Sequence, residues 1–275
     1  MAERSGADAE HRYRPYRQLL VAQVRSQTQY RLSFALDLGF STILTALDLA
    51  TLWVLFAVNH SLGGFGARDI LLMVGVAAFA FPLADLAVGN TEKLRVYVRS
   101  GLFDAVLLRP LSALGQLVAM DFAPRRVGRV LQGAVIYVVA LTVAPVRWSA
   151  PVAVLVVLAP LVGAVFFAAI FVAGATVAFW WIDSGEIANA FTYGGKDVAA
   201  YPMTVFGGLF RRFFAYGLGF AFVAYLPALA MLDRSDPLGT PDWLRWCSPL
   251  TSLVVATLAG MFWRAGVRHY RSTGS

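Results

Sequence analysis

The residues best suited to chemistry in this sequence are polar side chains that interrupt a long apolar stretch. They recur every three or four positions, so on a helix they form one stripe along its length. The stripe consists of Ser33, Asp37, Ser41, Thr45, Asp48 and Thr51. Because a carboxylate such as that of Asp48 costs about 2.5–3.5 kcal/mol at the centre of a membrane, the stripe must face protein or water. It is either the wall of a hydrophilic path or subunit interface, or a hydrogen-bonded helix contact.

A second acidic residue, Asp85, stands near the end of the next apolar stretch. Lys93 and Arg95 follow it within about three helical turns, and we expect one of them to pair with its carboxylate. The structural interpretation of Asp85 is therefore favoured, although an intramembrane carboxylate can also serve an ion pathway.

Catalytic and cofactor-binding signatures are absent from the sequence. The segment Gly194-Gly195-Lys196 is not a phosphate-binding loop, because Ala190 occupies the position of its first glycine and Asp197 replaces the Ser or Thr that holds magnesium. Asp183-Ser184-Gly185 lacks the leading glycine of a nucleophile elbow. The remaining candidate metal ligands and nucleophiles are too scattered to form a site; they are His11, His60, His269 and Cys247. We therefore expect no cofactor in this chain.

The composition predicts a membrane protein. Of the 275 residues, 59% are hydrophobic and only 14% are charged, and the mean hydropathy is +0.65. A soluble domain has about 45–50% apolar residues. The net charge of +7 is confined to segments between apolar runs. This charge therefore does not indicate a nucleic-acid-binding surface, because such a surface requires a folded soluble domain.

Six stretches have about the 20 apolar residues that a membrane-spanning helix needs. The predicted spans are residues 34–58, 70–90, 127–146, 151–182, 205–232 and 249–266. The fourth is long enough to be tilted, kinked at Pro160 or continued beyond the membrane, and Pro227 predicts a kink in the fifth. Residues 233–248 are either an interfacial or re-entrant element or a plain loop. The fold class is all-α and polytopic, in one transmembrane domain of residues 34–266.

The distribution of Lys and Arg predicts the orientation. Most of them fall in the N-terminal segment, in residues 91–129 and in the tail 267–275, with Lys196, Arg211 and Arg212 assigned to the same side. The positive-inside rule then places both termini in the cytoplasm. Within residues 1–33, the stretch 14–32 mixes leucine and valine with arginine, which predicts an amphipathic helix in the lipid headgroup layer, or else a disordered basic tail on anionic lipid.

The loop of residues 91–126 is predicted to be a helical hairpin, since loops of this length usually have a function. Gly101 breaks its first part, and a helix carrying Leu102, Phe103, Val106 and Leu107 on one face follows. That helix ends at Arg109-Pro110 because proline cannot continue the hydrogen-bond ladder. Ser112 then suits the N-cap of a second short helix with Leu114, Leu117 and Val118.

The hairpin also carries a recognisable motif, RSGLFDAVLLRP at residues 99–110. Together with Gln116, the RRVGR segment at 125–129, Tyr201-Pro202 and the six-span layout, it resembles the type-2 class of ABC transporter permeases. The resemblance is to an uncharacterised bacterial branch with two permeases and one ATPase per operon. It implies a half-transporter in the bacterial plasma membrane. Such a subunit pairs with an identical or homologous permease and with two copies of an ATPase that binds ATP and Mg.

The resemblance also assigns roles to residues. A coupling helix within residues 99–122 would contact the ATPase, and the N-terminal helix would touch it too. The implied coupling residues are Arg99, Gly101, Asp104, Leu107, Arg109 and Pro110, although Asp104 and Arg109 could simply be solvated. Candidate residues of the translocation path or of an interface are Asp37, Ser41, Thr45, Asp48, Thr51 and Asp85.

The function that these observations predict is export of an amphipathic, lipid-like or drug-like compound. The alternative is an ion-coupled secondary transporter that uses Asp48 and Asp85. Against it, the sequence shows no repeat of interrupted helices in two halves. An intramembrane lipid-modifying enzyme lacks a nucleophile or metal set.

Overall fold

The structure, a computed structural model, describes residues 31–120 and 126–271. Within its first helix the side chains of residues 31–34 and of Asp37 are not described. The predicted amphipathic helix of residues 14–32 therefore lies almost entirely outside the described part of the chain, as do Arg125 and the last four residues.

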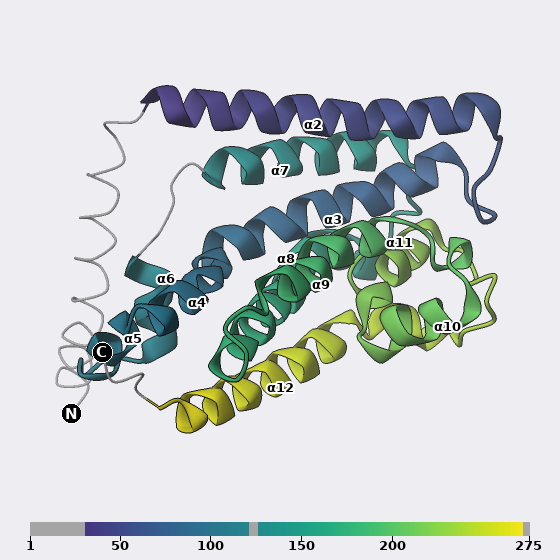
Figure 1. Ribbon diagram of the computed structural model, residues 1–275. Helices are drawn as coiled ribbons and strands as arrows, with labels where there is room; N and C mark the ends of the chain where they lie inside the picture. The colour runs from purple at the N-terminus through teal and green to yellow at the C-terminus, as the bar shows by residue number, and fades with distance from the viewer. Residues whose placement is uncertain (1–30, 121–125, 272–275) are drawn as a thin grey trace, which may run out of the picture.

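The described residues form a bundle of helices without a β-strand among them (Figure 1). In the part of the chain that the structure describes, five helices are long and apolar enough to cross a membrane, or six if the bent segment of residues 208–232 counts as one span. They are α2 (Arg31–Val58), α3 (Ala67–Val88) with its continuation through η1 (Gly89–Lys93) and α4 (Leu94–Arg99), α7 (Arg126–Val143), α8 (Ala150–Thr176) with η2 (Val177–Phe179), and α12 (Ser248–His269). The all-α, polytopic fold class is confirmed, and α8 runs through Pro160 as one helix.

Contacts between distant segments identify the two ends of this bundle. At one end, which we call the Arg99 end, Arg99 forms an ion pair with Asp183. At the other, the Arg234 end, the Arg234 guanidinium donates to the carbonyl oxygen of Gly64 at 2.9 Å. There the Thr204 hydroxyl donates to the neighbouring carbonyl of Gly63 at 2.8 Å. The chain therefore passes from one end of the bundle to the other between residues 183 and 204.

The helix that makes this passage is α9 (Gly185–Ala200), which the sequence did not predict as a span. It is only 16 residues long, so it is shorter than a typical membrane-spanning helix. It contains Glu186, Lys196 and Asp197, so its composition is not that of a lipid-facing helix. Because α9 packs against α3 and α8, part of its surface is shielded from lipid, and polar residues are tolerated on it.

Residues 205–232, which the sequence predicted as one span kinked at Pro227, do not form a continuous helix. After η3 (Met203–Val205), the segment is divided into α10 (Gly208–Phe210), the π-helix η4 (Arg211–Gly217), η5 (Phe220–Phe222) and α11 (Tyr225–Leu232). Its two halves are bent by 62°. Gly219 lies at the bend with a φ of +92°, which glycine adopts without a steric penalty, whereas Pro227 lies inside α11.

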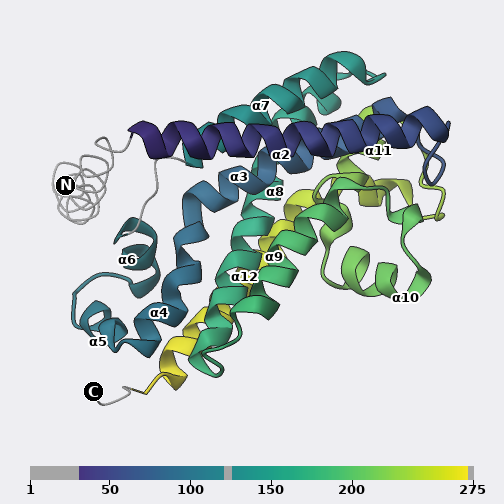
Figure 2. The same cartoon turned by 45° about the horizontal axis from the view of Figure 1, so that its top comes forward.

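Both ends of this bent segment lie at the Arg234 end of the bundle (Figures 1 and 2). It therefore enters and leaves on one side, as a re-entrant element does. Consequently Lys196, Arg211 and Arg212 do not belong on the side of the termini, as the alternation of loops predicted. The excess of Lys and Arg on that side remains without them, because the predicted N-terminal segment, the hairpin and the tail contain most of these residues.

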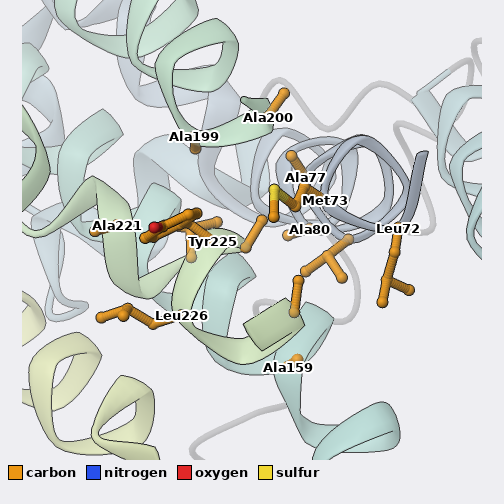
Figure 3. Packing of buried hydrophobic residues seen from close by; sticks show 14 of the residues in the cluster. Leu72, Met73, Ala77, Ala80, Ala159, Ala199, Ala200, Ala221, Tyr225 and Leu226 are labelled. Atoms are coloured by element: carbon orange, nitrogen blue, oxygen red, sulfur yellow. The ribbon is translucent and has the colours of Figure 1, made fainter. Parts of the chain in front are cut away.

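The core lies where α3 meets α8, α9 and α11, and small side chains line these contacts (Figure 3). Alanines at these contacts let the helices approach closely, as in other membrane bundles; they include Ala77, Ala80, Ala159, Ala199 and Ala221. The helices α7 and α3 approach closely at Gly133, where a Cβ atom would lie 2.1 Å from the Ala78 carbonyl oxygen. In contrast, α2 lies along the outside of the bundle, and Leu52 is the only buried one of its described side chains.

Candidate functional site

Two features of the bundle could serve a function, a helical hairpin at the Arg99 end and a cavity beneath α2. The hairpin follows α4 and consists of α5 (Leu102–Leu107) and α6 (Ala113–Met120). Gly101 turns the chain between α4 and α5 with a φ of +71°, a conformation that favours glycine. The Ser112 hydroxyl accepts a hydrogen bond of 3.2 Å from the Gly115 amide. This bond caps α6. Both short helices lie where the sequence predicted them.

The face of α5 that packs inward is narrower than expected. Phe103 and Val106 are buried, whereas Leu102 and Leu107 point outward, with 55% and 43% of their surface exposed. The helix is only six residues long, so two positions three residues apart provide its whole inner face. Of the four residues that the sequence placed on one face of this helix, only Phe103 and Val106 therefore pack inward.

Buried amides hold the two arms of the hairpin together. The side chain of Gln116, which is fully buried, donates hydrogen bonds to the carbonyl oxygens of Val106 at 2.9 Å and Leu111 at 3.2 Å. These carbonyls lie on either side of the break at Pro110 and lack the partners of a continuing helix. Asn90 of η1 donates to the Val118 carbonyl oxygen at 3.1 Å, which ties α6 to the end of the α3 helix.

Aromatic rings join the hairpin to the ends of two long helices. The ring of Phe103 lies 5.2 Å from that of Phe179 at the end of α8 and 5.0 Å from that of Tyr270 after α12. Trp263 of α12 packs against Phe179 at 5.5 Å. Burial and the neighbouring Asp104 carboxylate raise the pKa of the Tyr270 hydroxyl, which therefore stays neutral at physiological pH. The hairpin is thus fixed to the bundle through α5.

The outer tip of the hairpin is apolar and exposed. Leu108 has 87% of its surface exposed, and Leu107, Arg109 and Pro110 beside it are exposed too. Exposed leucines at the tip of a rigid element are typical of a protein interaction site. Of the other predicted coupling residues, Arg99 pairs with Asp183 in the turn before α9, and Asp104 lies beside Tyr270.

The cavity has a volume of about 780 Å³ and lies between α2 and the helices α3, α7 and α9. Figure 2 shows α2 crossing over these helices. The lining of the cavity combines aromatic, apolar and ionisable side chains. Its polar and aromatic residues are Phe40, Ser41, Thr45, Asp48, Phe81, Arg129, Gln132, Tyr193, Lys196, Asp197 and Tyr201.

The predicted polar stripe is divided between this cavity and helix packing. Thr45 and Asp48 line the cavity, so part of the stripe faces a polar space. Ser41 also lines it, but its hydroxyl donates to the Gln132 side-chain oxygen at 3.2 Å, which joins α2 to α7. The Thr51 hydroxyl donates to the Leu47 carbonyl oxygen of its own helix and does not line the cavity. The side chain of Asp37 is not among those that the structure describes.

Asp85 has cationic partners that the sequence did not predict. Its buried carboxylate lies 3.4 Å from Nε of Arg126 and 3.2 Å from a terminal nitrogen of Arg129, both at the start of α7. Arg126 also donates to the Asp85 carbonyl oxygen at 2.8 Å. Arg95 lies instead against Gly185, where α9 begins. Asp85 therefore joins α3 to α7. The sequence could not indicate this contact, because the two partners lie on a helix about 40 residues further along the chain.

Sequence analysis missed the contribution of α9 to the cavity. Tyr193, Lys196, Asp197 and Tyr201 come from α9 and its end, which the sequence placed in a loop. The recurrence of small and apolar residues every three or four positions, as at Thr192, Gly195 and Val198, is the signal that could have identified a helix with one shielded face.

A second polar centre that sequence analysis missed lies at the Arg234 end. The buried carboxylate of Asp236 accepts hydrogen bonds from the hydroxyls of Tyr225 at 2.5 Å and Thr240 at 2.6 Å. It thereby fixes the loop of residues 233–248, which contains the short helix η6 (Asp242–Trp246), against the bent segment. Arg234 forms an ion pair with Asp69 and lies 4.7 Å from the ring of Phe65.

Comparison with known proteins was informative at the family level. The model of a family described as ABC-2 family transporter protein matches residues 42–274, which include both the hairpin and the cavity. No curated protein and no solved structure matches the chain. In the part of the chain that the structure describes, no group of three or more His, Cys, Asp or Glu side chains is placed to hold a metal ion.

Proposed function

Because the chain belongs to the ABC-2 family of transporter proteins, we propose that it is the permease through which an ATP-driven exporter moves an amphipathic compound out of the cell. Membership of the family makes it a multi-pass membrane protein and a transport subunit of an ABC transporter. The direction of transport, the kind of cargo and the connection to an ATPase are the further steps of the proposal.

The single observation that carries the proposal is the way the hairpin is attached. Its exposed tip at Leu108 is free for a partner, while Phe103 on the opposite face is locked between α8 and α12. A force on the tip is therefore passed to the long helices instead of being lost in a mobile loop. An ATPase that binds ATP and Mg could use this connection, with two copies serving a pair of permeases.

The surface of α2 supports the pairing of permeases. Its apolar side chains are largely exposed along its length, in a region that also borders the cavity. A second permease, identical or homologous, would cover part of this surface and close the path. The concentration of Arg and Lys near the Arg99 end supports a cytoplasmic location of that end in a bacterial plasma membrane.

The ion-coupled alternative is not favoured by the geometry of its two acids. Asp85 is buried between Arg126 and Arg129, and an acid held by two cations is poorly suited to release and rebind ions. Asp48 lines the cavity but Asp85 does not, so the two acids do not share one site.

The proposal is tested by changing the tip of the hairpin. We would purify the chain with the ATP-binding cassette ATPase encoded beside it and replace Leu108 with Ser. The expected result is loss of the complex or of the stimulation of ATP hydrolysis, because the substitution removes apolar contact area. Leu209→Ser is the matched control, since Leu209 is equally exposed, at 85%, but lies at the Arg234 end.

Two outcomes would overturn the proposal. One is a complex with Leu108→Ser that assembles and hydrolyses ATP like the wild type. The other is equal impairment by both substitutions in proteins that remain monodisperse, which would show that the tip has no special role.

A further inference from the structure

We propose that the cavity between α2 and α3, α7 and α9 is a binding site for a cationic amphipathic compound, with Asp48 as the group that binds its positive charge. The inference rests on the proposed function, which explains why the cavity would bind a ligand. It concerns binding by this chain alone, however, and does not require an ATPase.

The charged residues that line the cavity indicate which charge a ligand would carry. Arg129 lies 3.2 Å from Asp85, which also pairs with Arg126, and Lys196 lies 3.6 Å from Asp197. Asp48 is the remaining acidic residue of the lining. Among the described residues, no Lys, Arg or His side chain forms an ion pair with its carboxylate. Each cation of the lining therefore has a carboxylate partner, whereas the Asp48 carboxylate has no cationic partner among the described residues.

The position of Asp48 makes a cationic partner favourable. It lies in the middle of the apolar span Leu38–Val58, where a carboxylate without a counter-charge is costly. A ligand that brings a positive charge next to it offsets this cost. An anionic ligand would instead have to compete with Asp85 for Arg129 or with Asp197 for Lys196.

Aromatic rings in the lining also suit a cation. The Nζ atom of Lys196 lies 6.0 Å from the centroid of the Phe81 ring, so one cation of the chain already lies over a ring of this cavity. Tyr193 and Tyr201 provide further rings from α9 and its end, and Phe40 provides one from α2. Organic ammonium and phosphonium ions are attracted to such surfaces because their charge is weakly hydrated.

The apolar remainder of the lining accounts for the amphipathic part of the ligand. Aliphatic side chains from α2, α3 and α7 complete the wall; they include Leu44, Leu49, Leu52, Val74 and Ile136. The cavity volume of about 780 Å³ is typical of sites for drug-sized molecules. The cavity is therefore large enough for one organic cation and too small for a folded polypeptide.

The test uses two probes of the same shape and opposite charge, tetraphenylphosphonium and tetraphenylborate. Binding to the purified full-length chain in nanodiscs of zwitterionic lipid would be measured by equilibrium dialysis, with empty nanodiscs as the blank. We expect the wild type to bind the cation more tightly than the anion. Asp48→Asn should weaken cation binding at least tenfold, and Asp48→Glu should retain it.

A second variant keeps the test independent of folding defects at Asp48. Lys196→Gln leaves Asp197 uncompensated, so it should strengthen cation binding, which a merely destabilising substitution would not do. Thr51→Ala, on the same helix but outside the lining, is the neutral control. Unchanged cation binding by Asp48→Asn, or a wild-type preference for tetraphenylborate, would overturn the inference.

The outcome is separable from that of the proposed function. If the ATPase binds and is stimulated while Asp48→Asn binds the cation normally, the inference fails and the proposed function stands. If the cation binds as expected but no ATPase associates with the chain, the site stands and the exporter proposal fails.

Discussion

The ring of Phe103 meets the ring of Tyr270 edge to face, with 5.0 Å between the centroids and 85° between the planes. Phe103 belongs to the short helix α5, and Tyr270 follows the last residue of α12, so the contact joins the hairpin to the final long helix. Edge-to-face pairs of this kind contribute about 0.5–1.5 kcal/mol beyond the area they bury. The contact is therefore strong enough to influence where the hairpin lies.

The first prediction concerns this pair. A double-mutant cycle of Phe103→Leu and Tyr270→Leu should give a coupling free energy of about 0.5–1.5 kcal/mol in unfolding experiments in mixed detergent micelles. Tyr270→Phe keeps the ring and should retain most of this coupling. A coupling indistinguishable from zero, as expected for Phe103 combined with the distant Leu209, would show that the rings do not hold the hairpin.

The second prediction concerns the amide that joins the two arms of the hairpin. Gln116→Leu should destabilise the hairpin by about 1–3 kcal/mol, because the buried carbonyl oxygen of Val106 and the partly buried one of Leu111 lose their donor. Amide hydrogen exchange in residues 102–120 should become faster while exchange in α8 stays unchanged. Ser112→Ala is the comparison, since loss of one exposed cap should cost about 1 kcal/mol. Uniformly faster exchange over the whole chain would contradict a local role for Gln116.

The third prediction contrasts the two acids of the membrane region. Asp85→Asn should lower the stability by about 3–5 kcal/mol, because Arg126 and Arg129 lose the carboxylate that compensates them. Asp48→Asn should leave the melting temperature unchanged or raise it, since Asp48 has no described cationic partner. Thermal unfolding of both purified variants checks this. Equal destabilisation by the two substitutions would refute the division into a structural and a ligand-binding acid.

The fourth prediction concerns the close contact between α7 and α3 at Gly133. Gly133→Val should prevent normal packing of α7 on α3, because its Cβ atom alone would meet the Ala78 carbonyl oxygen at 2.1 Å. Overpacking of this kind forces the backbones apart. The yield of monodisperse protein measures the effect. Gly260→Val in α12 is the matched control, since no atom lies within 4 Å of a Cβ atom built there. Normal yield of the Gly133 variant would mean that α7 lies farther from α3.

The fifth prediction concerns the path of the chain through the membrane. In a Cys247→Ser background, Leu209→Cys and Leu108→Cys would be labelled in intact cells with a membrane-impermeant thiol reagent. We expect labelling of residue 209 from outside, and of residue 108 only after permeabilisation. If residues 205–232 crossed as one helix that begins on the cytoplasmic side, both positions would be protected in intact cells.

The helical hairpin shows what the sequence alone could determine. Gly101, Pro110 and Ser112 act on their own backbone or on residues within one turn, so the boundaries of α5 and α6 follow from local chemistry without knowledge of the fold. The membrane-spanning character was equally accessible, because it depends on composition summed over about 20 residues. The motif at 99–110 then led to the family.

Only the tertiary structure decided which polar helix crosses the bundle and which acid is compensated. Helix α9 can carry Lys196 and Asp197 because α3 and α8 shield it, and no property of residues 185–200 alone indicates these neighbours. Asp85 finds its cations on α7, a helix far along the chain, while Asp48 finds none among the described residues. Hydropathy estimates the free energy cost of placing a segment in lipid. The actual cost depends on which other segments shield it from the lipid.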